Sequence, residues 1–260
     1  MRNLNRHKLF DSHFHIIDPR FPLVANQGYL PDEFSASDYL ARMQSYQLAG
    51  GAIVSGSFQA FDQSYLLAAL EELGPNFVGV TQLPASVSDE ELIRLNDAGV
   101  RAVRFNLKRG GSEGVEQLER FAKRVHETVG WHSELYVDSK DLPELHSTLA
   151  RLPAVSIDHL GLSGVGLPNL LALVEKGVFV KATGFGRIDF SATEAIKQIV
   201  SINPQALTFG TDLPSTRAPV PYSDKDFLLL IDALGETVAQ QVLFDNAARL
   251  YRPTKIADNT

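Results

Sequence analysis

The sequence predicts a single-domain (β/α)8 barrel, the TIM-barrel fold, and three observations lead to this prediction. The chain has 260 residues, and α/β barrels commonly occupy about 250 residues as one domain. Eight short apolar runs alternate with longer stretches of helical periodicity, which is the pattern of repeated βα units. No shift in composition marks a boundary, so residues 1–260 are expected to form one domain with its core at about 9–251.

The eight apolar runs are expected to be parallel strands, because each is followed by enough chain for a crossover helix. In order, the runs cover 9–11, 51–55, 77–82, 100–106, 134–138, 155–159, 178–183 and 207–212. Amphipathic stretches predict helices at 36–47, 64–73, 89–97, 115–128, 141–149, 168–176 and 193–200, and outer helices at 227–233 and 236–251. A short polar N-terminus and a mobile tail from about Lys255 are expected to flank the core.

Composition and charge exclude several classes of protein. Hydrophobic residues make up 44% of the chain and charged residues 21%, as in ordinary globular proteins with a large core. The net charge of −7 argues against binding to nucleic acid or to an anionic membrane surface. The absence of cysteine rules out disulfides and thiolate metal sites. With no apolar leader and no membrane span, the cytoplasm is the expected location, while the oligomeric state is left open.

A pair of histidines follows the first predicted strand, in the sequence DSHFH at 11–15. Barrel enzymes carry their active sites at the C-terminal ends of the strands, so these residues are the first candidates. Side chains alternate along a strand, so His13 and His15 share one face. Two such imidazoles suit a divalent metal ion or can polarise a substrate carbonyl. The alternative is a strand end that carries two solvated histidines.

His159 and Asp212 lie at the predicted ends of the sixth and eighth strands. Each has a structural alternative, a buried histidine bonded to a backbone carbonyl and an aspartate that stabilises a turn. Their combination with the first histidine pair favours catalysis, because all these strand ends meet at one rim of a barrel. The sequence therefore predicts a catalytic cluster of His13, His15, His159 and Asp212.

Arginines near the same predicted rim indicate an anionic ligand. Arg104 lies within an apolar run, Arg109 follows that run, and Arg187 lies on a glycine-rich loop after the seventh run. Guanidinium groups bind carboxylates through paired hydrogen bonds. A small anionic, carboxylated substrate is therefore expected, although Arg109 is equally compatible with a surface salt bridge.

Seven stretches together resemble the amidohydrolase-related TIM-barrel hydrolases, and within them the lactonase branch of the 2-pyrone-4,6-dicarboxylate lactonases. The resemblance extends in order from Asp11 to Tyr251. The matching stretches are DSHFH at 11–15, GVRAVRFN at 99–106 with KR at 108–109, GWH at 130–132 before Tyr136, IDH at 157–159, KAT at 181–183 with Arg187, FGTD at 209–212 and NAARLY at 246–251.

This resemblance implies a hydrolase that opens a carboxylate-bearing lactone. In that reading Asp212 activates water as the general base, and the three histidines surround the scissile carbonyl group. The implied carboxylate-binding residues are Arg104, Arg109, Arg187, Tyr136 and Ser57. Ionised aspartate and an imidazole or metal that stabilises an oxyanion make chemically coherent partners for this reaction.

Two loops depart from the pattern of the pyrone-dicarboxylate enzymes. Those enzymes typically have Trp-Pro-His after the last aspartate, where this chain has LPSTR at 213–217. They also tend to have Val-Phe-Gly-Pro after the histidine pair, where this chain has IIDP at 16–19. Both changes affect loops around the pocket, so substrate identity is less transferable than reaction class. Arg217 is either an additional anion contact or an exposed loop residue.

Metal dependence and reaction type have alternatives. His13, His15, His159 and Asp212 could ligate one zinc or manganese ion, but the resemblance to the pyrone-dicarboxylate branch favours no obligatory metal. A metal-dependent decarboxylase and a non-catalytic anion-binding barrel are the other functional hypotheses. Lys181 could form a Schiff base, but its alternation with Thr183 favours a salt bridge in the barrel wall.

Overall fold

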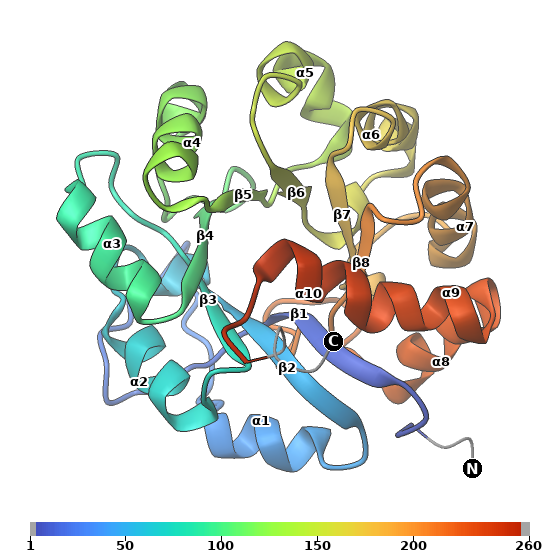
Figure 1. Ribbon diagram of the computed structural model, residues 1–260, viewed down its shortest axis with the longest axis horizontal. Helices are drawn as coiled ribbons and strands as arrows, with labels where there is room; N and C mark the ends of the chain where they lie inside the picture. The colour runs from blue at the N-terminus through green and yellow to red at the C-terminus, as the bar shows by residue number, and fades with distance from the viewer. Residues whose placement is uncertain (1–3, 256–260) are drawn as a thin grey trace.

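Eight parallel strands form a barrel in the computed structural model of this chain, which describes residues 4–255 (Figure 1). Neighbouring strands follow the order of the sequence. The strands are β1 (Lys8–Phe14), β2 (Gln47–Val54), β3 (Phe77–Thr81), β4 (Val100–Phe105), β5 (His132–Leu135), β6 (Val155–Ile157), β7 (Phe179–Ala182) and β8 (Leu207–Phe209). The predicted (β/α)8 barrel is confirmed. The predicted mobile tail, apart from Lys255 itself, lies outside the described residues.

A helix follows each strand, and all the helices but the last surround the barrel (Figure 1). They are α1 (Ala36–Met43), α2 (Ser64–Leu73), α3 (Asp89–Asp97), α4 (Val115–Val129), α5 (Leu142–Leu149), α6 (Leu167–Val174), α7 (Ala192–Ile202), α8 (Asp224–Leu234), α9 (Glu236–Gln240) and α10 (Asn246–Tyr251). A π-helical turn joins α9 to α10, so the predicted helix at 236–251 has three segments. No helix among residues 4–255 is long and apolar enough to cross a membrane.

The first two strands differ from their predicted bounds. Strand β1 was expected at 9–11 but continues to Phe14, which is paired with Ile53 of β2. The helix predicted at 36–47 ends at Met43, and a turn bond from the Tyr46 amide to the Met43 carbonyl follows it. Chain from Gln47 onward then pairs with β1. Cross-strand pairing therefore overrides the helical periodicity at the end of that stretch.

Contacts between β1 and the last strand close the barrel beside the histidine pair. The Ser12 hydroxyl donates to the Phe209 carbonyl at 2.6 Å. Just beyond the end of β8, the Asp212 amide donates to the His13 carbonyl at 2.7 Å, and the His15 amide donates to the Leu213 carbonyl at 2.7 Å. These backbone bonds hold the first and last strand ends together, although nearly 200 residues separate them in the sequence.

The opposite end of the barrel is closed by α10. Leu250 and Tyr251 of this helix form a buried cluster with Phe10 and Val54, which lie inside the barrel. A larger apolar core fills the space between the strands and the outer helices. With one end filled by apolar side chains, the C-terminal ends of the strands provide the accessible mouth.

Candidate active site

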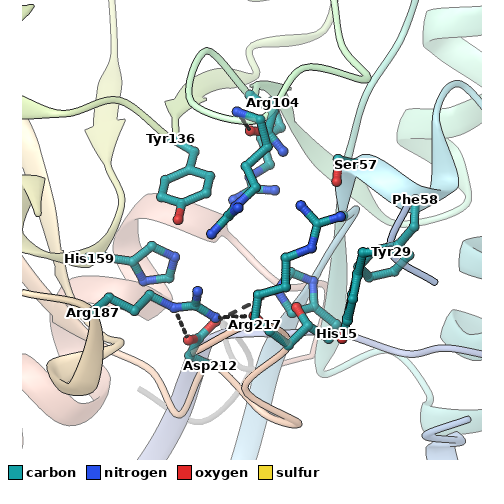
Figure 2. Close-up of a pocket in the computed structure, with 14 residues that line it drawn as sticks. His15, Tyr29, Ser57, Phe58, Arg104, Tyr136, His159, Arg187, Asp212 and Arg217 are labelled. Atoms are coloured by element: carbon teal, nitrogen blue, oxygen red, sulfur yellow. Dashed lines mark hydrogen bonds and ion pairs between the residues drawn. The ribbon is translucent and has the colours of Figure 1, made fainter. Parts of the chain in front are cut away.

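A pocket lies at the C-terminal ends of the strands, and fourteen residues of the described chain line it (Figure 2). Arg104 lies near the end of β4, and the other residues come from the segments after seven of the eight strands. The lining residues are His15, Tyr29, Gly56, Ser57, Phe58, Arg104, Asn106, Arg109, Tyr136, His159, Arg187, Asp212, Thr216 and Arg217. Eight of the nine residues predicted for the site are therefore in the lining, and the ninth, His13, is buried beside it.

The first histidine pair faces Asp212 even though the strand that carries it is irregular. Strand β1 has a register shift against β2 between Asp11 and Phe14. The Nε2 atom of His13 lies 3.8 Å from Asp212 Oδ1, and that of His15 lies 3.7 Å from the same oxygen. The two imidazole rings meet edge to face, with centroids 5.1 Å apart. The prediction that both histidines reach one site agrees with this geometry.

Hydrogen bonds at the inner ring nitrogens define the protonation of the two imidazoles. His15 Nδ1 lies 2.7 Å from the Val54 carbonyl oxygen, which only accepts, so Nδ1 carries the proton and Nε2 has a free lone pair. His13 Nδ1 lies 3.3 Å from the Lys181 ammonium, which only donates, and 3.5 Å from Asp158 Oδ1, which only accepts. We assign the proton of the neutral ring to Nε2 because the contact with Lys181 is the shorter one. The pocket thus receives an acceptor from His15 and a donor from His13.

His159 completes the imidazole cluster from the end of β6. Its Nδ1 lies 2.8 Å from the Thr183 hydroxyl, and its ring centroid is 4.9 Å from that of His13. Burial lowers the pKa of His159 well below its usual range. Burial and the nearby Lys181 ammonium lower the pKa of His13 to about 4. Both rings are therefore neutral near pH 7.

Asp212 is ion-paired in the ligand-free pocket. Its Oδ2 accepts a hydrogen bond of 2.6 Å from Arg187 Nε, while Arg187 also donates to the Thr216 carbonyl at 2.8 Å. Burial acts to raise the pKa of Asp212, but the Arg187 guanidinium and then His159 outweigh it and hold this pKa well below its usual range. The carboxylate is therefore ionised and, while Arg187 holds it, only weakly basic.

Two buried atoms beside the pocket lack a hydrogen-bonding partner among the described residues. They are His13 Nε2, a donor, and Asp212 Oδ1, an acceptor. Buried polar groups are normally paired, and an unpaired one commonly marks a place for water, an ion or a ligand. The two atoms are 3.8 Å apart. At this distance Asp212 Oδ1 can accept from an attacking water while His13 Nε2 donates to a carbonyl oxygen.

A network of buried ion pairs lies inside the barrel beneath the imidazole cluster. Lys181 Nζ lies 2.5 Å from Glu134 Oε2 and 3.5 Å from Asp158 Oδ1. Asp158 in turn accepts from Arg104 at 2.8 Å. Although burial acts to raise the pKa of both acids, Lys181 lowers the pKa of Glu134 to about 2 and, with Arg104, that of Asp158 well below its usual range. All four side chains are almost completely buried, which fits the predicted salt bridge for Lys181.

The remaining predicted substrate-binding residues surround the imidazole cluster (Figure 2). The Tyr136 ring meets His159 edge to face with centroids 5.1 Å apart, and the Arg104 guanidinium lies 5.4 Å from the Tyr136 ring centroid. Arg104 is committed to Asp158 and to the Ser55 carbonyl, so it has less freedom to bind substrate than Arg109.

The residues fit a single divalent ion in type and number. His13, His159 and Asp212 offer ligand atoms that all lie within 4.8 Å of one another, and the three residues are buried. Imidazole nitrogen and carboxylate oxygen are ligands of zinc and manganese. Binding through His13 Nε2 requires its proton to leave that atom, which the Lys181 bond at Nδ1 opposes. His15 is not part of this three-residue group.

Several residues of the pocket were not predicted from the sequence. Tyr29 and Phe58 line it, and Asn26 hydrogen-bonds to two of its loops. Tyr29 and Asn26 lie in the long segment between β1 and α1, where no strand-end rule applies and no local motif marks a binding residue. The departure of 16–19 from the family pattern was the one signal that this segment shapes the pocket.

An eight-stranded barrel with imidazoles and one carboxylate at its mouth has the architecture of a barrel hydrolase. The chain belongs to the amidohydrolase family, whose sequence profile matches residues 10–252. Its resemblance to this family, predicted from seven short stretches, is confirmed.

Two curated relatives and one solved structure resemble the chain along nearly its whole length. A 2-pyrone-4,6-dicarboxylate hydrolase of Comamonas testosteroni is 27% identical, over 95% of this chain and 90% of the relative. A 4-sulfomuconolactone hydrolase of Rhizobium radiobacter is 28% identical, over 93% and 89%. The structure of a candidate 2-pyrone-4,6-dicarboxylic acid hydrolase from Pseudomonas putida has a TM-score of 0.78 and 26% identity, over 94% and 97%.

Proposed function

We propose that this chain, acting as one domain, hydrolyses a lactone whose ring carries an acid group. The charge of the pocket carries the proposal: Asp212 is the single carboxylate among the fourteen lining residues of the described chain, which include four arginines. Three imidazoles lie beside this carboxylate, and those of His13 and His159 are neutral near pH 7. The names of the two curated relatives, both hydrolases of acidic ring compounds, support the same reaction class.

In the proposed reaction Asp212 is the general base. Its Oδ1 accepts a proton from a water molecule while the water oxygen bonds to the lactone carbonyl carbon. The carbonyl oxygen becomes an oxyanion, to which His13 donates from Nε2. Collapse of the tetrahedral intermediate breaks the ring carbon–oxygen bond, and the departing oxygen takes up the proton held by Asp212. The product is the ring-opened acid.

Arg187 adjusts the basicity of Asp212 in this scheme. The ion pair between them keeps the carboxylate ionised but weakens it as a base. A substrate carboxylate competes for the Arg187 guanidinium, because it offers the same kind of charge-assisted hydrogen bond as Asp212. Loss of that partner raises the pKa of Asp212 and strengthens the base at the moment when the substrate is bound.

A panel of lactones tests the proposed function directly. We expect the purified protein to consume alkali at constant pH with lactones that carry a carboxylate or sulfonate, and to do so poorly with neutral lactones. Release of carbon dioxide that stops on adding a chelator would select the decarboxylase hypothesis. Tight binding of acidic ligands without product under any condition would select the anion-binding barrel.

The lack of cysteine and the negative net charge favour a cytoplasmic enzyme that does not bind nucleic acid.

Metal removal should leave turnover unchanged. If an ion binds, His13, His159 and Asp212 would hold it, and it would polarise the substrate carbonyl. We nevertheless propose that no metal is obligatory, because Arg187 already neutralises Asp212 and Lys181 disfavours the ligand form of His13. The measurement is kcat after exhaustive chelation, with elemental analysis of the same sample. Loss of turnover that zinc or manganese restores would contradict this proposal.

A further inference from the structure

Two arginines of the pocket have no acidic partner. Arg104 is paired with Asp158, and Arg187 is paired with Asp212. Among residues 4–255, no carboxylate lies within ion-pair distance of Arg109 or Arg217. Burial, and then the charge of Arg109, lower the pKa of Arg217. The mouth therefore holds two uncompensated positive charges close together, in a chain with a net charge of −7.

Neutral groups hold Arg217 in the ligand-free pocket. Its Nη1 donates to Asn26 Oδ1 at 3.1 Å, its Nη2 donates to the Asn26 carbonyl, and its guanidinium lies 4.3 Å from the Tyr29 ring centroid. Asn26 Nδ2 also donates to the Arg109 carbonyl at 3.1 Å. One asparagine thus joins the loops that follow β1, β4 and β8. Figure 2 shows Arg217 extending into the middle of the pocket beside Tyr29.

The free space in the pocket is too small for a substrate ring while Arg217 lies across it. The cavity has a volume of about 30 Å³, which is room for about two water molecules. Binding of a lactone therefore requires a lining side chain to move. Arg217 is suited to move, because an acid group offers it charge-assisted hydrogen bonds that are stronger than those to the neutral Asn26.

We propose that Arg217 determines substrate specificity by changing its binding partner when the substrate enters the pocket. It exchanges Asn26 for an acid group on the substrate ring and, together with Arg109, binds this group at the outer edge of the pocket. The inference rests on the proposed function, because this acid group lies on the part of the ring remote from the ester that faces Asp212, whereas the carboxylate that competes for Arg187 lies beside that ester. The ligand chemistry is an oxyanion, supplied by a ring carboxylate or a ring sulfonate.

Binding of unreactive ligands to Arg217→Gln tests whether Arg217 binds an acid group of the ligand. We expect the affinities for isophthalate and 3-sulfobenzoate, measured by calorimetry, to fall by about 10- to 100-fold, the effect of losing hydrogen bonds to a charged group. The affinity for isophthalamide, a neutral ligand of similar shape, should stay within about twofold of the wild type. A larger loss for 3-sulfobenzoate than for isophthalate indicates that Arg217 prefers the sulfonate, and the reverse indicates that it prefers the carboxylate.

Asn26→Asp provides a second variant in which Arg217 is retained. The new carboxylate should occupy the guanidinium, lower the affinity for both anions by about tenfold and leave the melting temperature unchanged or higher. Arg120→Gln, an exposed change on α4, is the matched control and should alter none of these affinities. Unchanged affinity for both anions in either test variant, or an equal loss for isophthalamide, overturns the proposal. Because no ligand is consumed, the result can be read even if the chain hydrolyses no lactone.

Discussion

Replacing Asp212 with asparagine is expected to lower kcat/KM for an acidic lactone by about 10²- to 10⁴-fold, the usual contribution of a general base. The amide keeps the shape of the side chain but cannot accept the proton of the attacking water. Asparagine also tolerates the left-handed backbone of this position, where φ is 59°. The measurement is initial-rate alkali uptake on the best lactone of the panel.

Ligand binding separates loss of the base from loss of the fold in this variant. Asp212→Asn removes the carboxylate that holds Arg187, so isophthalate should bind at least as tightly as it does to the wild type. Asp224→Asn is a suitable control, because Asp224, the first residue of α8, is paired with Arg42 and does not line the pocket. Turnover within tenfold of the wild type in Asp212→Asn would contradict its role as the base.

The fold could be predicted from the sequence because each βα unit carries its own local signal. Apolar runs and amphipathic stretches recur in order, and α2 and α3 have the predicted bounds. The errors lie where a non-local contact decides the local structure. Strand β1 extends to Phe14 because β2 continues to pair with it, and the segment before Tyr46 stops being helical for the same reason. Periodicity within one stretch contains no information about such a partner.

The members of the site could likewise be predicted, but the pairing of their charges could not. Strand-end position places His13, His159 and Asp212 at one rim in any barrel of this type. The sequence does not show that Arg187 would hold Asp212, because the two are brought together by adjacent loops. It also gives no signal for Asn26, whose role depends on three loops that meet in space.

Replacing Lys181 with methionine is expected to lower the free energy of unfolding by about 3–5 kcal/mol, because the change leaves buried carboxylates without their cation. Lys181 Nζ contacts both Glu134 and Asp158, and all three side chains are fully buried. Equilibrium unfolding in denaturant measures the effect. Lys197→Met is the matched control, since this exposed lysine lies 3.8 Å from Glu194, and its loss should cost about 1 kcal/mol or less.

Removing one of the two carboxylates tests whether the loss of stability in Lys181→Met comes from the unbalanced buried charge or from the lost packing of the lysine side chain. In Lys181→Met the Glu134 carboxylate loses the cation that lowers its pKa to about 2, so its burial becomes unfavourable. The double variant Lys181→Met/Glu134→Gln should therefore be more stable than Lys181→Met alone, even though it departs further from the wild type. Equal or lower stability of the double variant would mean that lost side-chain packing dominates. If Lys181→Met is as stable as the wild type, Lys181 does not stabilise the buried carboxylates of Glu134 and Asp158.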